Sequence, residues 1–224
     1  MEYRLSIKRV LVDGSVLSLE ADVTMHWTQI AVAAALAVYI GAFVAIMAVV
    51  RRSTGANPRG HARGHLVAAL LNGLASLLLL VTAIAYSFYA QSVDWFGRIV
   101  PLGGPVAQGL GLASLILAGV YLIWGEASLG HSFRVALPER KLPLVTHGIY
   151  RFTRNPLALS VDLLALGVLL LAPSWLALAS LVLNIVGYEG KIRAEEAYLR
   201  DAHGAAYEAY CQRTGRYFSR VLRD

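Results

Sequence analysis

The residues best suited to chemistry lie in one stretch, residues 144–157, which reads Leu-Val-Thr-His-Gly-Ile-Tyr-Arg-Phe-Thr-Arg-Asn-Pro-Leu. Gly148 permits a tight turn, and Tyr150 places an aromatic face beside two arginines. Pro156 suits the first turn of a helix, where its missing N–H costs nothing. Asn155 is pushed out of the α region by this proline, so we expect it to cap that helix. The free N–H groups of such a helix start form a seat for an anionic or polar ligand group.

A second set of charged residues, Lys191-Ile-Arg-Ala-Glu195-Glu196, follows the last apolar run. Neighbouring helical residues point about 100° apart, so the two glutamates cannot share one face. Glu196 can pair with Arg200 at i,i+4, which leaves Glu195 to face inward. An inward carboxylate is matched to a cationic ligand.

A purely structural interpretation of these charges stays open on the residues alone. Arg151, Arg154 and Lys191 could be interfacial anchors for lipid phosphates. Glu195 and Glu196 could form a solvated helix face, since such charges are common at membrane surfaces.

The chain lacks the motifs of many soluble enzymes, among them GxGxxG, GxxxxGK(S/T), HExxH, GxSxG and a paired CxxC. His61 and His65 are four residues apart, but a Gly-rich loop without carboxylate or thiol partners is a poor ligand platform, so no metal is expected. The single cysteine, Cys211, excludes an intramolecular disulfide and has no evident activating partner. The sequence assigns no catalytic side chain.

Composition places these residues on a membrane protein. Hydrophobic residues make up 57% of the chain and charged residues only 15%, too few for a soluble surface. Apolar runs at about 27–50, 66–90 and 105–124 predict three membrane spans. Another run, 156–188, is interrupted at Pro173, which predicts a tight helical hairpin that is tilted or stops short of the far face. We therefore expect an all-α integral membrane protein of about five transmembrane helices with a cytoplasmic C-terminal helix.

The chain is expected to form a single membrane domain, residues 1–224. Residues 1–26 are a lead-in without a functional account, 27–124 carry three spans, and 125–224 hold a polar loop, the hairpin and the C-terminal helix. Loop 51–65, stretch 125–156 and the tail from 189 hold 16 of the 20 Lys and Arg residues. The positive-inside rule places all three in the cytoplasm, so the net charge of +6 is a topology signal and no nucleic-acid partner is expected.

The two charged stretches resemble motifs of the isoprenylcysteine carboxyl methyltransferase and phospholipid methyltransferase family. Residues 144–156 resemble its LVTxGxYRxxRHP motif, and residues 191–210 resemble its RIxxEExxLxxxFGxxYxxY tail. Residues 129–134 (Leu-Gly-His-Ser-Phe-Arg) also resemble the segment that precedes the first motif. The resemblance covers about residues 125–218, with the motifs in the family's order and spacing.

This resemblance implies a cofactor, S-adenosylmethionine, held between the inter-helix loop and the C-terminal helix under the cytoplasmic membrane surface. Tyr150 would contact the cofactor, Glu195 would bind one of its polar groups and Glu196 would support that contact. Lys191 occupies the place of an arginine that the family uses toward substrate. The implied cofactor-binding residues are Leu144, Val145, Gly148, Tyr150, Arg154, Asn155, Pro156, Leu157, Glu195 and Glu196.

The function expected from the resemblance is methyl transfer to a hydrophobic, lipid-like acceptor at the inner membrane face. A carboxylate, as in isoprenylcysteine carboxyl methylation, is the first choice, and a phospholipid amine or a thiol is the alternative. Asp162, about 9 Å into its helix, is an intramembrane acid and a candidate acceptor-site residue. A structural hydrogen bond from Asp162 to Ser160, Asn184 or another helix is an equal alternative.

Departures from the family pattern keep two other functions open. Asn155 replaces the motif's histidine, Ala158 replaces a usual tyrosine, and Leu142 replaces a frequent histidine. A reductase of the sterol-reductase type, which binds NADPH, carries a Tyr-Cys pair like that at residues 210–211. The adjacent pair at residues 195–196 favours the methyltransferase instead. A non-catalytic membrane scaffold with the same fold is the third possibility.

Overall fold

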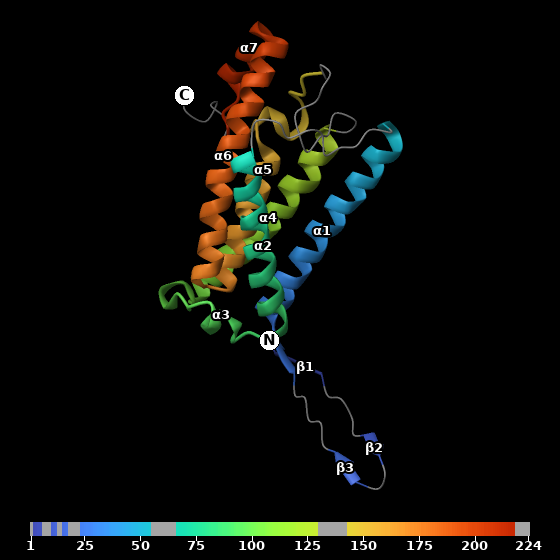
Figure 1. The fold of residues 1–224 in the computed structure, drawn as a ribbon, viewed down its shortest axis with the longest axis vertical. Coiled ribbons are helices and arrows are strands. Elements are labelled where there is room, and N and C mark those ends of the chain that lie inside the picture. The colour runs from blue at the N-terminus through green and yellow to red at the C-terminus, as the bar shows by residue number, and fades with distance from the viewer. Residues whose placement is uncertain are drawn as a thin grey trace.

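The computed structural model describes residues 2–5, 10–12, 15–17, 23–54, 66–129 and 143–217 (Figure 1). The elements in chain order are β1 (Glu2–Leu5), β2 (Val10–Val12), β3 (Ser15–Leu17), β4 (Val23–His26), α1 (Trp27–Thr54), α2 (Leu66–Phe88), α3 (Ser92–Trp95), η1 (Val100–Leu102), α4 (Pro105–Leu129), η3 (Gly148–Arg151), α5 (Pro156–Leu171), α6 (Trp175–His203) and α7 (Ala205–Arg213).

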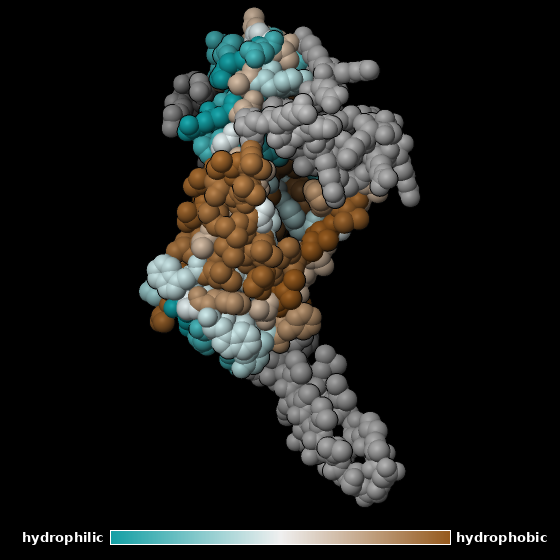
Figure 2. All heavy atoms as spheres, viewed as in Figure 1, coloured by the Kyte–Doolittle hydropathy of each residue, from teal (hydrophilic) through white to brown (hydrophobic). Residues whose placement is uncertain are grey.

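Three of these helices are long and apolar enough to cross a membrane, over Trp27–Ala45 of α1, Leu66–Phe88 and Pro105–Leu129. At about 1.5 Å per residue, each matches a hydrocarbon core of about 30 Å. Their large apolar side chains stay exposed; Leu77 of α2 and Ile116 of α4, for example, are 56% and 58% exposed. Figure 2 shows hydrophobic residues gathered in a broad band over the middle of the visible face. These helices make the chain an integral membrane protein.

Helices α5 and α6 differ from the three long apolar helices. α5 is a shorter apolar helix of 16 residues, which begins at Pro156 as predicted. Ser174 caps α6, where its hydroxyl accepts a hydrogen bond from the Ala177 N–H at 3.3 Å. α6 then runs for 29 residues, about 43 Å, which is longer than a bilayer core of about 30 Å is thick. One continuous helix thus carries both an apolar segment and the charged residues after Tyr188.

The turn between α5 and α6 is bound to the loop that follows α3. The N–H of Ile99 donates to the carbonyl of Pro173 at 2.9 Å, and the N–H of Trp175 donates to the carbonyl of Gly97 at 3.0 Å. The α5–α6 turn therefore lies at the same end of the bundle as the loop after α3.

Close helix contacts hold the bundle together where glycine replaces a side chain. A Cβ atom on Gly167 of α5 would lie 2.5 Å from Cδ2 of Leu115 and 3.0 Å from the carbonyl oxygen of Gly111, both on α4. On the other side of the bundle, the Ser180 hydroxyl of α6 donates to the Ala75 carbonyl of α2 at 2.8 Å. Small residues let membrane helices approach closely, and polar side chains bond across them.

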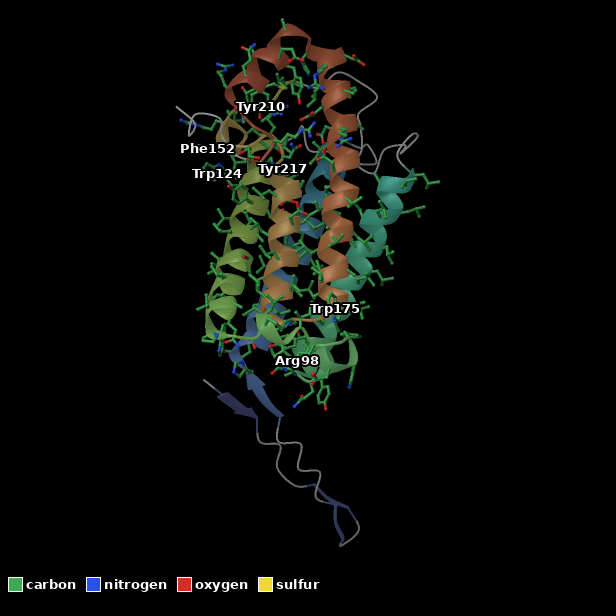
Figure 3. All side chains as sticks on the ribbon, turned by 90° about the vertical axis from the view of Figure 1, so that its left-hand side faces the viewer. Arg98, Trp124, Phe152, Trp175, Tyr210 and Tyr217 are labelled. Carbon is green, nitrogen blue, oxygen red and sulfur yellow. The ribbon has the colours of Figure 1, made fainter. Side chains whose placement is uncertain are left out.

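The two ends of the bundle carry different groups. Trp124, Phe152, Tyr210 and Tyr217 lie toward the α7 end, whereas Trp175 and Arg98 lie at the opposite end (Figure 3). The end of α4, η3, the start of α5 and the later half of α6 therefore share one end of the molecule. This is the end where both charged stretches were predicted to meet.

Several sequence expectations are refined by the structure. From residue 27 onward every named element of the described residues is a helix, but the lead-in contains two antiparallel strand pairs, β1–β4 and β2–β3, in place of an all-α arrangement. α1 continues to Thr54 and α4 to Leu129, beyond the predicted ends at 50 and 124. The His61–His65 pair, Leu142 and residues 130–134 of the predicted motif lie outside the described residues.

The α4–α5 contact generates a stability prediction. We expect Gly167→Ala to destabilise the protein by about 1–3 kcal/mol, because the new methyl group overpacks against Leu115 and the α4 backbone. Thermal unfolding of the detergent-solubilised protein measures this loss of stability. Gly109→Ala is the matched control, since a Cβ there meets no atom within 4 Å. Equal effects of the two variants would mean that the close contact does not stabilise the bundle.

Candidate functional site

The first predicted motif lies on a short turn held against the end of α4. Gly148 has φ 59°, a conformation that side chains other than glycine rarely adopt. A Cβ atom at Gly148 would also clash with the side chain of Ser128 on α4. The Ser128 hydroxyl accepts a hydrogen bond from the Ile149 N–H at 3.3 Å. Both properties of the glycine are therefore needed to place η3 against α4.

The C-terminal segment binds the same motif from the other side. The Tyr210 hydroxyl of α7 donates to the Tyr150 carbonyl at 2.6 Å. The Arg154 N–H donates to the Gly215 carbonyl at 3.0 Å. The Arg216 carbonyl accepts from the Thr153 hydroxyl at 2.8 Å and from the Asn155 side-chain amide at 3.2 Å. A stretch just before α5 is thus fixed by residues about 60 positions later in the chain.

Asn155 occupies the predicted N-cap position of α5, but its predicted capping bond is wrong. Its side chain accepts no hydrogen bond from the first turn of α5. The side-chain amide is oriented instead toward the Arg216 carbonyl. Pro156 is buried at the first position of α5, and Leu157 contacts α4, since its Cδ2 lies 3.0 Å from the position of a Cβ on Gly125.

A buried ion cluster joins the two predicted motifs. Nη1 of Arg154 lies 3.1 Å from Oε1 of Glu196, and their side chains are only 9% and 5% exposed. Arg216 donates to both Glu196 oxygens, at 2.9 and 2.7 Å. Arg200 lies 3.9 Å from Glu196, which confirms the predicted i,i+4 pair but makes it the most distant of the three. We call Arg154, Glu196 and Arg216 the ion cluster.

The charge state of Glu196 follows from these contacts. Burial acts to raise the pKa of its carboxyl, but the Arg216 hydrogen bond and the charges of Arg154, Arg216 and Arg200 outweigh burial and hold that pKa below its ordinary value. Glu196 is therefore ionised and paired with arginines. The prediction that Glu195 is the inward-facing carboxylate is wrong, because Glu196 is the buried one and Glu195 is exposed.

Arg154 has two further partners on α7. Its Nη1 donates to the Tyr207 hydroxyl at 3.2 Å and to the Cys211 sulfur at 2.8 Å. Leu144 packs against the small cluster that Tyr207, Tyr210 and Cys211 form. The lone cysteine thus has a structural role that its position in the sequence did not indicate.

Tyr150 and Glu195, one from each motif, interact electrostatically at this end of the bundle. Burial raises the pKa of Tyr150, and the nearby Glu195 carboxylate raises it further. Glu195 keeps an exposed side chain, although the surrounding protein still raises the pKa of its carboxyl by desolvation. Lys191, one turn earlier, opposes that rise and stacks its ammonium 5.6 Å from the Tyr188 ring centroid. Glu195 is thus an exposed carboxylate whose charge acts on a buried tyrosine.

The remaining predicted site residues lie around this pair or deeper in the bundle. Leu144 and Val145 are partly buried just before η3. Asp162 lies on α5 with its Oδ1 buried and without a hydrogen bond, and both side-chain polar atoms of Asn184 also lack one. The Ser160 hydroxyl bonds instead to the Leu157 carbonyl and to Tyr39, at 2.7 and 2.9 Å. The expected alternative of an Asp162 bond to Ser160 or Asn184 is therefore wrong.

One acidic residue at this end, Glu126, was missed by the sequence analysis. It lies in the last turn of α4, is 5% exposed, and its charge also raises the pKa of Tyr150. Gly111, Leu115, Ala118 and Leu122 precede it on the same face of α4, but only the structure shows that this face is buried. The predicted span ended at Trp124, so Glu126 was expected in a polar loop.

The ion cluster predicts a pH-dependent stability. We expect Glu196→Gln to lower the stability at pH 7 by roughly 3 kcal/mol, because it leaves buried arginine charge unpaired. A carboxyl whose pKa is lowered by folding stabilises the folded state above its unfolded pKa of about 4, and this contribution is lost as the pH falls through the folded value. The difference in unfolding temperature between wild type and Glu196→Gln should therefore become smaller as the pH is lowered.

Glu208→Gln is the control for that measurement. Glu208 pairs with Arg200 at 2.9 Å, but its side chain is 54% exposed. Exposed pairs contribute about 0–1 kcal/mol. A Glu196→Gln effect no larger than that of Glu208→Gln would contradict the stabilising role of the ion cluster.

Comparison with known proteins bears on this end of the molecule. No match to a curated protein was found for the chain. Residues 106–206 match the family model described as phospholipid methyltransferase. The matched region contains nearly all of α4 together with η3, α5 and α6, and so includes Glu126, Tyr150 and Glu195. This agreement confirms the predicted resemblance to that family over residues 106–206.

Proposed function

We propose that the protein transfers a methyl group from S-adenosylmethionine to a hydrophobic, lipid-like acceptor at the cytoplasmic membrane face. The observation that carries this proposal is the electrostatic interaction between Tyr150 and Glu195, which come from two separate motifs at one end of the bundle. The match of residues 106–206 to a methyltransferase family supports the reaction class. Both residues lie where α4, α5 and α6 reach the membrane surface.

The residues at this end fit the cofactor. S-adenosylmethionine is cationic at its sulfonium and ammonium groups, and Glu195 offers an accessible carboxylate to such a group. Tyr150 adds an aromatic face, which attracts cations. Leu144, Val145, Pro156 and Leu157 supply partly or fully buried apolar surface nearby. The bound cofactor would supply a methyl group already activated by the sulfonium charge.

The protein's own contribution is to position the reactants. The ion cluster fixes the segment before α5 to α6, and with it the spacing between Tyr150 and Glu195. Arg154 and Glu196 are therefore positioning residues in this proposal. Glu196 is occupied by Arg154 and Arg216. Arg154 is occupied by Glu196, Tyr207 and Cys211. Proximity and orientation can supply roughly 7–11 kcal/mol of barrier lowering for a transfer between two bound groups.

The orientation and the acceptor also belong to the proposal. The positive-inside rule directs loop 51–65 and the C-terminus to the cytoplasm. We propose that α5 and the first half of α6 complete five spans within a single domain. A carboxylate acceptor is the first choice from the resemblance, with an amine or thiol as alternatives. Lys191 and Asp162 are candidate acceptor-binding residues. Lys191 interacts electrostatically with Glu195, and Asp162 has a buried oxygen without a hydrogen bond on α5.

The reductase alternative has less support. Its sequence signal was the Tyr210-Cys211 pair, but both side chains have structural partners. The Tyr210 hydroxyl donates to the Tyr150 carbonyl, and the Cys211 sulfur accepts from Arg154. These contacts account for the pair without a nicotinamide cofactor.

Cofactor binding tests the proposal. Purified full-length protein in nanodiscs should bind S-adenosylmethionine in calorimetry, and Glu195→Gln should weaken the affinity about 10-fold to 100-fold, because a charge-assisted hydrogen bond contributes about 1.5–3 kcal/mol. Glu208→Gln, an exposed acid on α7, should leave the affinity unchanged. Binding of NADPH without S-adenosylmethionine would favour the reductase, and binding of neither would favour a scaffold.

A further inference from the structure

An apolar groove of about 560 Å³ runs along the outer face of α4. It is lined by Ile116, Gly119, Val120, Ile123, Trp124 and Ala127. These residues recur every three or four positions, so they form one stripe on the helix. Gly125, which packs against Pro156 and Leu157 of α5, lies about 180° around α4 from Ile116 at about 100° per residue. We call this stripe the α4 groove; it faces away from α5.

The length of the α4 groove matches one leaflet of a bilayer. Ile116 and Ala127 are 11 positions apart, about 16 Å along the helix at about 1.5 Å per residue. Half of a hydrocarbon core of about 30 Å is about 15 Å. A second apolar groove of about 310 Å³, between α1 and α4, shares Ile116 and Gly119 with the first and continues it away from the α7 end. The α4 groove therefore offers one acyl chain a path through the leaflet on the α7 side.

An aromatic pair and an arginine lie at the α7 end of this groove. Trp124 lines the groove, and its ring centroid lies 6.1 Å from that of Phe152. The Arg151 guanidinium carbon lies 5.2 Å from the Phe152 ring centroid. Figure 3 shows Trp124 and Phe152 together at this end, and each is 45% exposed. Exposed aromatic rings at the end of a membrane helix mark the headgroup level. Arg151 therefore lies at the level of lipid phosphates.

The charge of Arg151 distinguishes it from its neighbours. Arg154, Arg193, Arg200 and Arg216 each pair with a glutamate. Among the residues that the structure describes, no carboxylate forms an ion pair with Arg151, which is exposed. A guanidinium forms strong charge-assisted hydrogen bonds with phosphate oxygens. Arg151 above an acyl-chain groove thus complements an anionic lipid.

We propose that α4 and η3 bind one anionic phospholipid of the cytoplasmic leaflet, with an acyl chain in the α4 groove and the phosphate at Arg151. This lipid is a bound partner and not the methyl acceptor. Its site is separate from the candidate cofactor site, because Tyr150 of η3 is buried whereas Arg151 and Phe152 are exposed. The inference uses the proposed cytoplasmic orientation, since anionic lipids are found in that leaflet, but it does not depend on methyl transfer.

Lipid titration of the full-length protein, delipidated in detergent and followed by native mass spectrometry, tests the headgroup. Phosphatidylglycerol is the probe, because it is anionic and carries no amine, carboxylate or thiol for methyl transfer. Phosphatidylcholine with the same acyl chains is the zwitterionic comparison. Wild type should bind the first phosphatidylglycerol about 5-fold more tightly, the effect of one basic residue at an anionic membrane surface.

Two arginine variants locate the headgroup. Arg151→Gln should abolish the preference for phosphatidylglycerol. Arg213→Gln should retain it, since it removes an exposed arginine of α7 and changes the net charge equally. Equal affinities of wild type for the two lipids, or an unchanged preference in Arg151→Gln, would overturn the proposal.

Gly119→Leu tests the position of the acyl chain. A Cβ at Gly119 meets no atom within 4 Å, so the new side chain enters the groove without displacing the bundle. It should weaken the binding of both lipids about 5-fold, because it removes apolar surface that the chain would cover. Gly109→Leu is the matched control, since its Cβ position is equally open but it does not line the groove. The same affinity in both variants would overturn the assigned chain path.

These measurements can fail independently of the proposed function, since none of them uses S-adenosylmethionine. Selective phosphatidylglycerol binding by a protein that binds no S-adenosylmethionine would reject the proposed function alone. Binding of S-adenosylmethionine that depends on Glu195, in a protein without a phosphatidylglycerol preference, would reject the lipid site alone.

Discussion

The salt bridge between Arg154 and Glu196 is the constraint on which the rest of the site depends. Arg154 lies just before α5 and Glu196 lies on the later half of α6, so this buried pair joins two separate segments of the matched family region. Arg216 closes the cluster, and its own carbonyl accepts hydrogen bonds from Thr153 and Asn155. Without this arrangement, Tyr150 and Glu195 would belong to two independent segments of chain.

The membrane determines where this cluster can exist. Charged groups inside a hydrocarbon core are costly, so three charges can gather only where the helices leave the bilayer. α4 and α6 both reach that level, because each begins at the opposite end of the bundle and extends for 25 residues or more. The polar site is therefore built from helix ends, while the glycines at 111 and 167 keep α4 and α5 close enough for those ends to converge.

Much of this arrangement could be predicted from sequence, because it depends on local signals. Long apolar runs fix the spans, Pro156 fixes the start of α5, and the spacing of Glu195 and Glu196 puts them on different faces of one helix. The burial of Glu196 against Arg154 and Arg216 could not be predicted, since Arg216 is 20 residues beyond Glu196 and only the tertiary fold brings it back. The Asn155 side-chain amide also donates to the backbone carbonyl of Arg216, and its side chain does not cap α5.

Glu126 illustrates a different limit of sequence reasoning. A single acid at the end of an apolar run has the composition of a helix leaving the membrane, and nothing in the local pattern tells whether it faces solvent or the interior. Its burial follows from the packing of α4 against α5 and η3, where Gly125 permits close approach to Pro156 and Leu157. The acid is interior because the whole face to which it belongs is interior.

The central claim is that two distant segments bind one cofactor molecule together, and hydrogen–deuterium exchange with and without S-adenosylmethionine tests it most directly. The account predicts that cofactor protects amides in residues 148–157 and 191–200 over the same concentration range, while α3 and the loop after it are unchanged. Protection of only one of these segments, or protection confined to the opposite end of the bundle, would contradict it.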